Sequence, residues 1–461
     1  FLKLIKDNEK KEQSIMFIQA RQIFVLAPVL TLVSLISLPS IVSGSSETVE
    51  GSVNISMLFD DLGDPPRWKE WVIDQAFDEL RERHPNLDIS LDFKPVPYQN
   101  LRSQFLEFSA NESNIDIIDI DPTWLGEFVE KGLLTDLTNL SQNWEGSDDL
   151  YQEFFDAGVY GGGLYGVYII SDIRALWYWK DMLKEAGVDP ESLKTWDGYV
   201  AAAKQLNLKL RPEGIEGAHL VGASHSPDIE FYPYLWMLGG DILQRREGHP
   251  TKGTYWFPAF NGSEGVRALQ FIKDQIQAGI KPQMEHHWGK EFLDRKFAIM
   301  LEALQHHIPF LPVDQQQNFE NEIGMIPMFP VPNPNSSSAS LLGGWELGIP
   351  ADSKNKDLAW EMITIMSEPE IISPLLQKYG YLPTRISIGE NPNSTSTNMT
   401  LPYYDQVVSM IEIGRTRPNI PEYPQIAHYI KEALDAVYYD TKDPMEALDD
   451  AATKSAKALG W

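Results

Sequence analysis

The sequence predicts an α/β protein in which mostly parallel, doubly wound sheets carry helices on both faces. Strand-like and helix-like segments alternate from residue 53 to residue 131, and strand–helix–strand repeats produce parallel strands. The chain has 461 residues, which is too many for one ordinary hydrophobic core. Its hydrophobic content of 43% and aromatic content of 11% are typical of folded globular proteins. We therefore expect two α/β domains.

Three strand–helix pairs open this alternation. The expected strands are Val53–Phe59, Leu87–Phe93 and Ile115–Ile120, and the helices after them are Trp68–Arg83, Tyr98–Ala110 and Trp124–Lys131. Leu87–Phe93 alternates apolar and polar residues strictly, which is typical of a strand with one buried face. His84-Pro85-Asn86 supplies the turn that ends the first helix.

Later segments continue the same pattern with clear end signals. We expect helices at Ser263–Ala278 and Asp357–Met366, strands at Phe297–Leu301 and Ile323–Met328, and loops at Pro330–Ser340 and Asn391–Thr400. Ser263 is the expected N-cap of its helix, and Gly279 is the expected stop. The run Gly161-Gly162-Gly163 indicates a tight hairpin rather than a phosphate-binding loop, because no helix start follows it.

The N-terminal segment predicts export. Arg21 precedes an apolar run at Ile23–Leu38, and small residues follow at Pro39–Gly44, as in a secretory signal peptide with a start at Met16. The alternative is an uncleaved membrane anchor, although the run is short for a span. Several Asn-X-Ser/Thr sequons also fit an extracellular or cell-surface protein.

Charge and cysteine content exclude several functions. The formal net charge is −28 and the isoelectric point about 4.7, which argues against nucleic acid and anionic membrane surfaces as partners. The chain has no cysteine, so it has no disulfide, thiol nucleophile or thiolate metal site.

Enzyme and metal signatures are also missing. No P-loop, GxSxG, HExxH or GxGxxG motif occurs at a suitable place. The doublets His286-His287 and His306-His307 are poor metal sites, because adjacent side chains point apart on a helix or a strand. We therefore expect no catalytic residues, no metal and no cofactor. A glycosidase would need two carboxylates at a defined distance in space, and a sequence does not give that distance.

Two acidic positions follow strands of the predicted sheet. In doubly wound sheets, ligands bind beyond the carboxyl ends of the strands. Asp60-Asp61 follows the first strand and Asp121 follows the third. Both positions are therefore candidates for a ligand site.

The segment Leu341–Pro350 is the strongest single candidate. Gly343-Gly344 allows close approach of a backbone, Trp345 offers an apolar face that can stack on a sugar ring, and Glu346 can accept from hydroxyls. The alternative is an ordinary strand end, with Trp345 in the core and the glycines at a bulge.

The order of several motifs resembles a known family. The matching segments are Asp121–Phe128, Gly163–Val167, Asp172–Asp181, Thr195–Asp197, Leu238–Asp241, Leu342–Trp345, Ser353–Lys356 with Ala359-Trp360, Gly380–Arg385, and Arg417-Pro418 with Tyr423-Pro424. Together they resemble extracellular solute-binding proteins of ABC importers, in the sugar-binding group that includes the maltose/trehalose-binding proteins. The resemblance covers the chain from about Ser52 to its end.

This resemblance implies a periplasmic-binding-protein-like fold of type II, with two discontinuous lobes that close on a sugar. Its expected division is an N-terminal extension at 1–50, a first lobe at 51–171 and 323–351, and a second lobe at 172–322 and 352–461. The implied partners are a sugar or oligosaccharide and the ABC permease with its ATPase. The implied state is a monomer.

The resemblance also implies a set of binding residues. Trp345 would stack on a sugar ring, Asp121 and Asp172 would accept from hydroxyls, and Arg102 and Arg385 would donate to sugar oxygens. The remaining members of the expected site are Asp61, Trp236, Gly344 and Glu346.

One departure from the family affects the expected ligand. Relatives often carry a stacking aromatic after the strand expected at Phe297–Leu301, and this chain has Glu302–His307 there without a Trp. A stacking face is lost or is replaced by His306, which favours a smaller or more polar ligand. The competing functions are a glycan-active hydrolase and a surface carbohydrate-binding protein.

Overall fold

The computed structural model describes residues 51–60, 72–110, 114–221, 229, 231–283, 288–390 and 401–461. The described ranges all belong to one compact unit, Val49–Trp461. The predicted apolar segment Ile23–Leu38, Asp61 and His286-His287 lie outside the described residues. Within the described ranges, no helix has both the length and the apolar character needed to cross a membrane.

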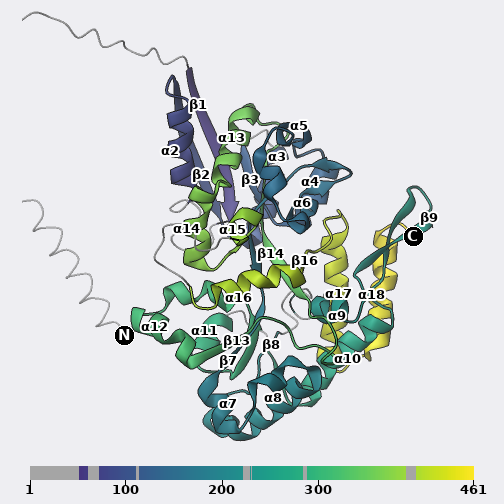
Figure 1. The fold of residues 1–461 in the computed structure, drawn as a ribbon. Coiled ribbons are helices and arrows are strands. Elements are labelled where there is room, and N and C mark those ends of the chain that lie inside the picture. Colours follow the sequence, from purple (N-terminus) through teal and green to yellow (C-terminus); the bar gives the residue numbers. More distant parts are fainter. Residues whose placement is uncertain are drawn as a thin grey trace, which may run out of the picture. The chain divides into compact units, whose positions relative to one another are not determined.

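A seven-stranded sheet organises the first part of the described chain (Figure 1). Its strands run in the order β15-β6-β14-β3-β1-β2, and β16 also pairs with β14. Their bounds are β1 Gly51–Asp60, β2 Leu87–Val96, β3 Ile117–Ile120, β6 Val167–Ile173, β14 Ser340–Gly348, β15 Leu382–Pro383 and β16 Gly414–Arg415. The expected parallel pairing is confirmed for β1 with β2 and with β3, whereas β14 is antiparallel to β3 and β6. The sheet is therefore mixed.

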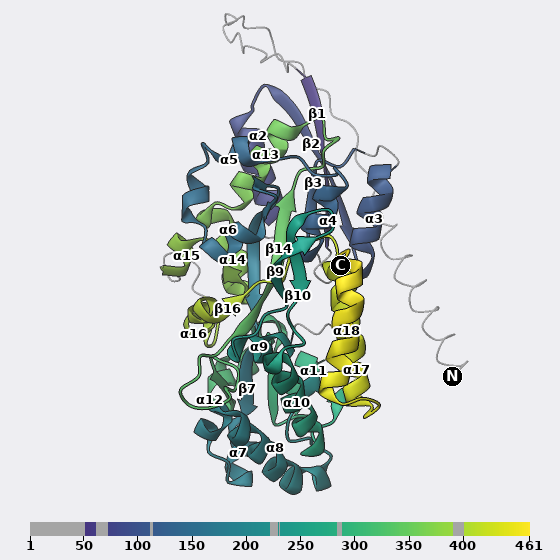
Figure 2. The ribbon, with the colours of Figure 1, turned by 90° about the vertical axis from the view of Figure 1, so that its right-hand side faces the viewer.

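Helices cover both faces of the β1–β3 part of this sheet, as the strand–helix alternation predicts. On one face, α2 (Asp74–Arg83) packs with α13 (Lys356–Met366) and α14 (Pro369–Tyr379) over Ile55 and Met57. On the other face, α3 (Tyr98–Ala110) and α4 (Leu125–Glu130) pack over Leu58, Ile118 and Ile120. Figure 2 shows α2 and α3 on opposite sides of β1 and β2.

A second core surrounds a three-stranded antiparallel sheet in the order β12-β7-β13. Its strands are β7 Ala175–Trp179, β12 Ile299–Glu302 and β13 Ile323–Ile326. The larger helices that contribute to this core are α7 Lys180–Ala186, α8 Trp196–Leu210, α9 Phe231–Met237, α10 Ser263–Gln277, α12 Val313–Glu322, α16 Tyr404–Ser409, α17 Tyr423–Tyr438 and α18 Pro444–Ala458. The fold is thus α/β, with two larger sheets and a principal core around each of them.

Two strands run between these cores in opposite directions. In β6, Val167 and Ile170 belong to the first core and Ile173 to the second. In β14, Leu341 and Leu342 belong to the second core and Leu347 to the first. Strands that cross between two cores leave the side chains near their middle at the junction, and the candidate site lies there.

Two expected boundaries need correction. The helix at Ser263–Gln277 has Gly262 as its N-cap, whereas Ser263 is its first residue. Residues 356–379 were expected in the second lobe, but the apolar faces of α13 and α14 pack in the first core beside α2. An ion pair of 3.0 Å between Arg83 and Glu368 joins these helices. The expected hairpin is confirmed, because β4 (Val159–Tyr160) pairs with β5 (Gly163–Leu164) around the glycines.

Candidate ligand-binding site

Three aromatic side chains from separate elements meet beside β14. The half-buried Trp345 lies edge-on to Tyr98, with ring centroids 5.7 Å apart. Tyr98 stacks on Trp124 at 5.5 Å and an interplanar angle of 20°. Tyr98 begins α3, Trp124 ends the 3-10 helix η2 (Pro122–Trp124), and Trp345 belongs to β14. The helical segments that follow β2 and β3 therefore supply two of the three rings, as the rule for strand ends predicts.

This aromatic cluster borders a cavity of about 260 Å³. The lining residues are Tyr98, Asp121, Asp172, Arg174, Ile229, Leu341, Gly343, Gly344, Trp345 and Arg417. Four of the predicted site residues, Asp121, Asp172, Gly344 and Trp345, thus come together around one cavity. The remaining polar groups are two arginines and a tyrosine hydroxyl, so hydrogen-bonding groups converge beside an apolar ring face.

Two ion pairs join the charged side chains that line the cavity. Arg174 pairs with Asp172 through Nη1 and Oδ1, and its Nε lies 3.6 Å from Oε1 of Glu302. Arg417 Nη2 lies 3.3 Å from Oδ1 of Asp121. These side chains are mostly buried, with exposed fractions of 20% or less for the four residues of the two pairs. Each acid of the cavity therefore has a guanidinium beside it.

The conformation and packing of the β14 backbone require a glycine at Gly344. Its φ is +126°, and a Cβ there would lie 2.1 Å from the carbonyl oxygen of Ile170 on β6. The β6–β14 register shifts between Trp345 and Glu346, which is a bulge. The missing Cβ of Gly344 therefore lets the two strands approach next to this bulge, whereas Gly344 itself is regularly paired with Ser171. Trp345, by contrast, faces the cavity.

Glu346 does not line the cavity, in contrast to its expected contact with ligand hydroxyls. Its side chain is 0% exposed and rests against Gly166, where a Cβ would approach Oε2 to 2.6 Å. Within the described residues, neither carboxyl oxygen has a hydrogen-bond partner. Burial first, and then the neighbouring charge of Asp121, raise the pKa of Glu346 well above its ordinary value. Burial therefore favours the neutral form of this carboxyl group.

We predict that Glu346→Gln stabilises the protein increasingly as pH rises. Below about 4.3, the usual pKa of an unfolded glutamate, both states are protonated and the two proteins should be equally stable. Above it, the unfolded state releases its proton first, so wild type loses about 1.4 kcal/mol of unfolding free energy per pH unit up to the raised folded pKa. Urea unfolding from pH 4 to pH 9 measures the difference.

Glu412→Gln is the control for this prediction, because Glu412 is exposed. Its stability difference from wild type should not change with pH in the same way. If the difference in unfolding free energy between Glu346→Gln and wild type stays constant from pH 4 to pH 9, Glu346 is ionised in the folded protein.

Two predicted arginines are engaged elsewhere. Arg102 donates to both carboxylate oxygens of Glu127, at 2.8 and 2.7 Å, and so ties α3 to α4. Arg385 donates to Asp149 at 2.7 Å and to the carbonyl of Ser367, at the end of α13, at 2.9 Å. Neither lines the cavity. Their geometry supports a structural role, and the predicted ligand contacts gain no support from it.

Trp236 and His306 also lie away from the cavity. Trp236 is 6% exposed and packs on Tyr232, with the guanidinium of Arg415 over its ring at 5.0 Å. His306 packs against Tyr381 at 4.4 Å and bonds to the carbonyl of Tyr379 at 2.7 Å, so it does not replace a stacking aromatic in the cavity. In the part of the chain that the structure describes, no cluster of three or more His, Asp and Glu could hold a metal ion.

Three polar residues of the cavity, Tyr98, Arg174 and Arg417, were not among the predicted site residues. Tyr98 directly follows β2, so the rule that identified Asp121 at a strand end also applies to it. Arg174 and Arg417 both stand in motifs that carry the family resemblance, and Arg174 is two residues from the predicted Asp172. Their role became visible only because their partners, Asp172 and Asp121, also line the cavity.

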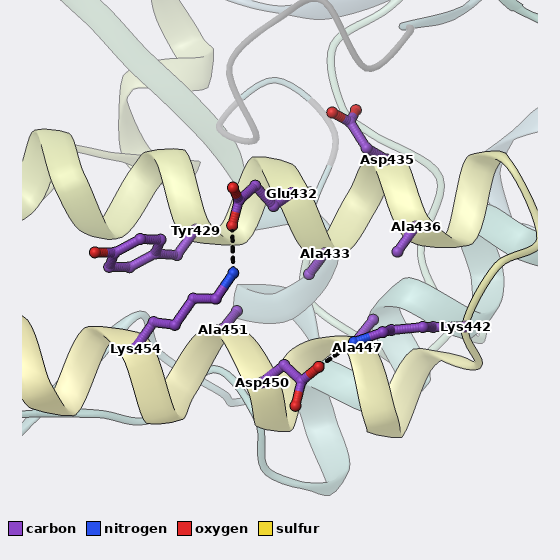
Figure 3. A pocket seen from close by; sticks show the side chains of 10 residues that line it. All are labelled: Tyr429, Glu432, Ala433, Asp435, Ala436, Lys442, Ala447, Asp450, Ala451 and Lys454. Atoms are coloured by element: carbon purple, nitrogen blue, oxygen red, sulfur yellow. Dashed lines mark hydrogen bonds and ion pairs between the residues drawn. The ribbon is translucent and has the colours of Figure 1, made fainter.

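Two other cavities have a different character. One, of about 300 Å³, lies between α17 and α18, where Lys454 pairs with Glu432 at 2.7 Å and Lys442 pairs with Asp450 (Figure 3). The alanine side chains that line this cavity are small, so they leave open space between the two helices. The other, of about 320 Å³, borders residues 415–420 and shares Arg417 with the aromatic cavity. Neither contains any of the predicted site residues.

Comparison with known proteins identifies the family. Residues 62–371, more than half of the chain, match the sequence model described as bacterial extracellular solute-binding protein. This chain therefore belongs to the bacterial extracellular solute-binding protein family. Membership agrees with an exported protein and with a binding role.

Relatives of known sequence or structure cover most of the chain. A putative binding protein of Brucella abortus is 24% identical, covering 83% of this chain and 89% of its own length. The arabinooligosaccharide-binding protein of Bacillus subtilis is 22% identical, covering 81% and 86%. The crystal structure of an ABC transporter solute-binding protein from Thermotoga lettingae, bound with α-D-tagatose, superposes with a TM-score of 0.71 at 21% identity, covering 89% and 100%. The expected type II solute-binding-protein fold is thus confirmed.

Proposed function

We propose that this protein is the extracellular substrate-binding component of an ABC importer, and that it binds a sugar or a small oligosaccharide. The observation that carries the proposal is the cavity beside β14, where Trp345 and Tyr98 adjoin Asp172, Arg174 and Arg417. Sugars present apolar ring faces and polar edges, and an aromatic face beside hydrogen-bonding groups complements both.

The names of two relatives support this ligand class. The Bacillus subtilis relative is an arabinooligosaccharide-binding protein, and the Thermotoga lettingae relative was crystallised with a ketose sugar. The cavity volume of about 260 Å³ lies near the lower end of ordinary ligand sites. A small sugar therefore fits this volume better than a long oligosaccharide.

The proposed mechanism is closure of two lobes on the ligand. The first lobe would hold the core formed by β1–β3, α2, α13 and α14, and the second lobe would hold the core around β7, β12 and β13. β6 and β14, which run between the two cores, would form part of the hinge. Closure by hinge motion around a ligand is the usual mode of periplasmic binding proteins. The closed form would then deliver the sugar to permease subunits and their ATPase.

Ligand titration with scattering tests both parts of the proposal. We expect at least one of D-tagatose, maltose and arabinotriose to bind in a one-to-one complex by calorimetry. The radius of gyration should decrease at saturation, because the lobes approach each other. Incubation with aryl glycosides is the parallel assay for a hydrolase.

The outcomes separate the alternatives. Failure of all three sugars to bind would contradict the ligand class, and binding without compaction would contradict the closure mechanism. Turnover of an aryl glycoside would instead support a glycan-active hydrolase.

A further inference from the structure

Asp121 occupies a buried position at the edge of the cavity. Its side chain is the N-cap of η2, and only 5% of the residue is exposed. Oδ1 accepts from the backbone N–H of Thr123 at 2.9 Å and from the Thr123 hydroxyl at 2.7 Å. One oxygen of the Asp121 carboxylate is therefore already hydrogen-bonded within its own turn, to Thr123.

Groups from two distant segments bind the same carboxylate. The Tyr98 hydroxyl donates to Oδ2 at 3.0 Å, and Arg417 Nη2 lies 3.3 Å from Oδ1 and 3.4 Å from Oδ2. A carboxylate has about four lone-pair sites, and these donors fill them. Asp121 consequently has little capacity left to accept a hydrogen bond from a sugar hydroxyl.

The two groups that Asp121 binds are well placed to contact a ligand. Tyr98 is 42% exposed, and its ring lies in the aromatic cluster with Trp124 and Trp345. An exposed tyrosine held at its hydroxyl loses little further freedom when a ligand binds, which is the basis of preorganisation.

Arg417 is also held in place by its own segment. Its neighbour Thr416 donates through N and Oγ1 to Glu153 at 2.9 and 3.0 Å, and the Asn419 amide donates to the carbonyl of Ala157 at 2.8 Å. The backbone of residues 416–419 is thus attached to α6 (Gln152–Ala157), and the Arg417 guanidinium lies beside Asp121.

We infer that Asp121 is a positioning residue, which orients the Tyr98 phenol and the Arg417 guanidinium so that the ligand contacts these two groups rather than the carboxylate. This inference rests on the proposed sugar-binding function for its ligand and replaces the expected role of Asp121 as a hydroxyl acceptor. It adds Tyr98 and Arg417 to the residues that determine affinity.

Ligand-free protein provides the first test. Asp121→Asn keeps the shape of the side chain and remains a good N-cap, so the variant should fold. Its amide nitrogen replaces one acceptor, so Tyr98 should lose its fixed orientation. We expect Asp121→Asn to lose most of the near-ultraviolet circular dichroism that Tyr98→Ala loses, because the stacked Tyr98–Trp124 pair is disturbed in both. Thr123→Val, which removes another donor to the same carboxylate, should retain that signal.

A double-mutant cycle on affinity provides the second test, with D-tagatose and arabinotriose as probes. Asp121→Asn and Tyr98→Phe should each weaken binding about 10-fold, the order expected for a lost hydrogen bond to a charged group. The double variant should bind about as weakly as Asp121→Asn alone, because both changes remove the same anchor. Thr123→Val should bind within about twofold of wild type.

The two tests fail differently. Unchanged circular dichroism in Asp121→Asn, or fully additive losses in the cycle, would overturn the positioning role, since additivity means that Asp121 acts independently of Tyr98. If wild type binds neither these two probes nor maltose, the proposed ligand class fails, and the circular dichroism comparison still decides whether Asp121 orients Tyr98.

Discussion

Replacing Trp345 by alanine should weaken sugar binding about 30- to 1000-fold. Removal of an aromatic anchor from a binding site typically costs on the order of 2–4 kcal/mol, which corresponds to that range of dissociation constants. Trp345 is half-buried, lines the cavity and meets Tyr98 and Trp124 edge-on at 5.7 and 6.4 Å. Calorimetry with the best-binding sugar of the panel measures the loss.

Trp360→Ala is the matched control. Trp360 is also half-buried and packs against the same core as Trp345, but it lies against Trp144 and not at the cavity. Both variants should lower the melting temperature, because each removes partly buried indole surface. Only Trp345→Ala should lose affinity. Equal affinities of the two variants would mean that Trp345 is a core residue without a role in binding.

Gly344→Ala should destabilise the protein by about 2–6 kcal/mol. A backbone conformation that L-residues rarely adopt costs about 1–3 kcal/mol, and overpacking adds about 1–3 kcal/mol. Gly344 has a φ of +126°, and its Cβ would overlap the carbonyl oxygen of Ile170, which belongs to the backbone and cannot rotate away. β14 and β6 must therefore separate next to Trp345, so affinity should fall together with the unfolding free energy.

Gly132→Ala separates the two causes of this loss. Gly132 also has a positive φ, +68°, but a Cβ there would meet no atom within 4 Å. Its replacement should cost only the roughly 1–2 kcal/mol of a left-handed residue and leave affinity unchanged. Chemical unfolding compares the two variants. A Gly344→Ala loss no larger than that of Gly132→Ala would show that β14 and β6 have room to adjust.

Local sequence patterns predicted several elements of the fold correctly. The helix Tyr98–Ala110 has the predicted bounds, and the first three strands pair in parallel as the strand–helix repeats require. Periodicity and end signals are local properties, which is why they succeed here. The direction of β14 and the packing of α13 and α14 in the first core depend on distant contacts, and the sequence did not reveal them.

The sequence by itself determined the class of protein, the order of its elements and the two parts of the chain where the cavity forms. Asp121 follows a parallel strand and Trp345 follows a pair of glycines, and both line the cavity. Only the tertiary structure decided which charged groups face it. Arg417 reaches Asp121 across 296 residues and Arg385 reaches Asp149 across 236. The environment of a charged side chain is set by the partners that folding brings within a few ångströms. Local sequence patterns do not identify those partners, because they lie far apart in the chain.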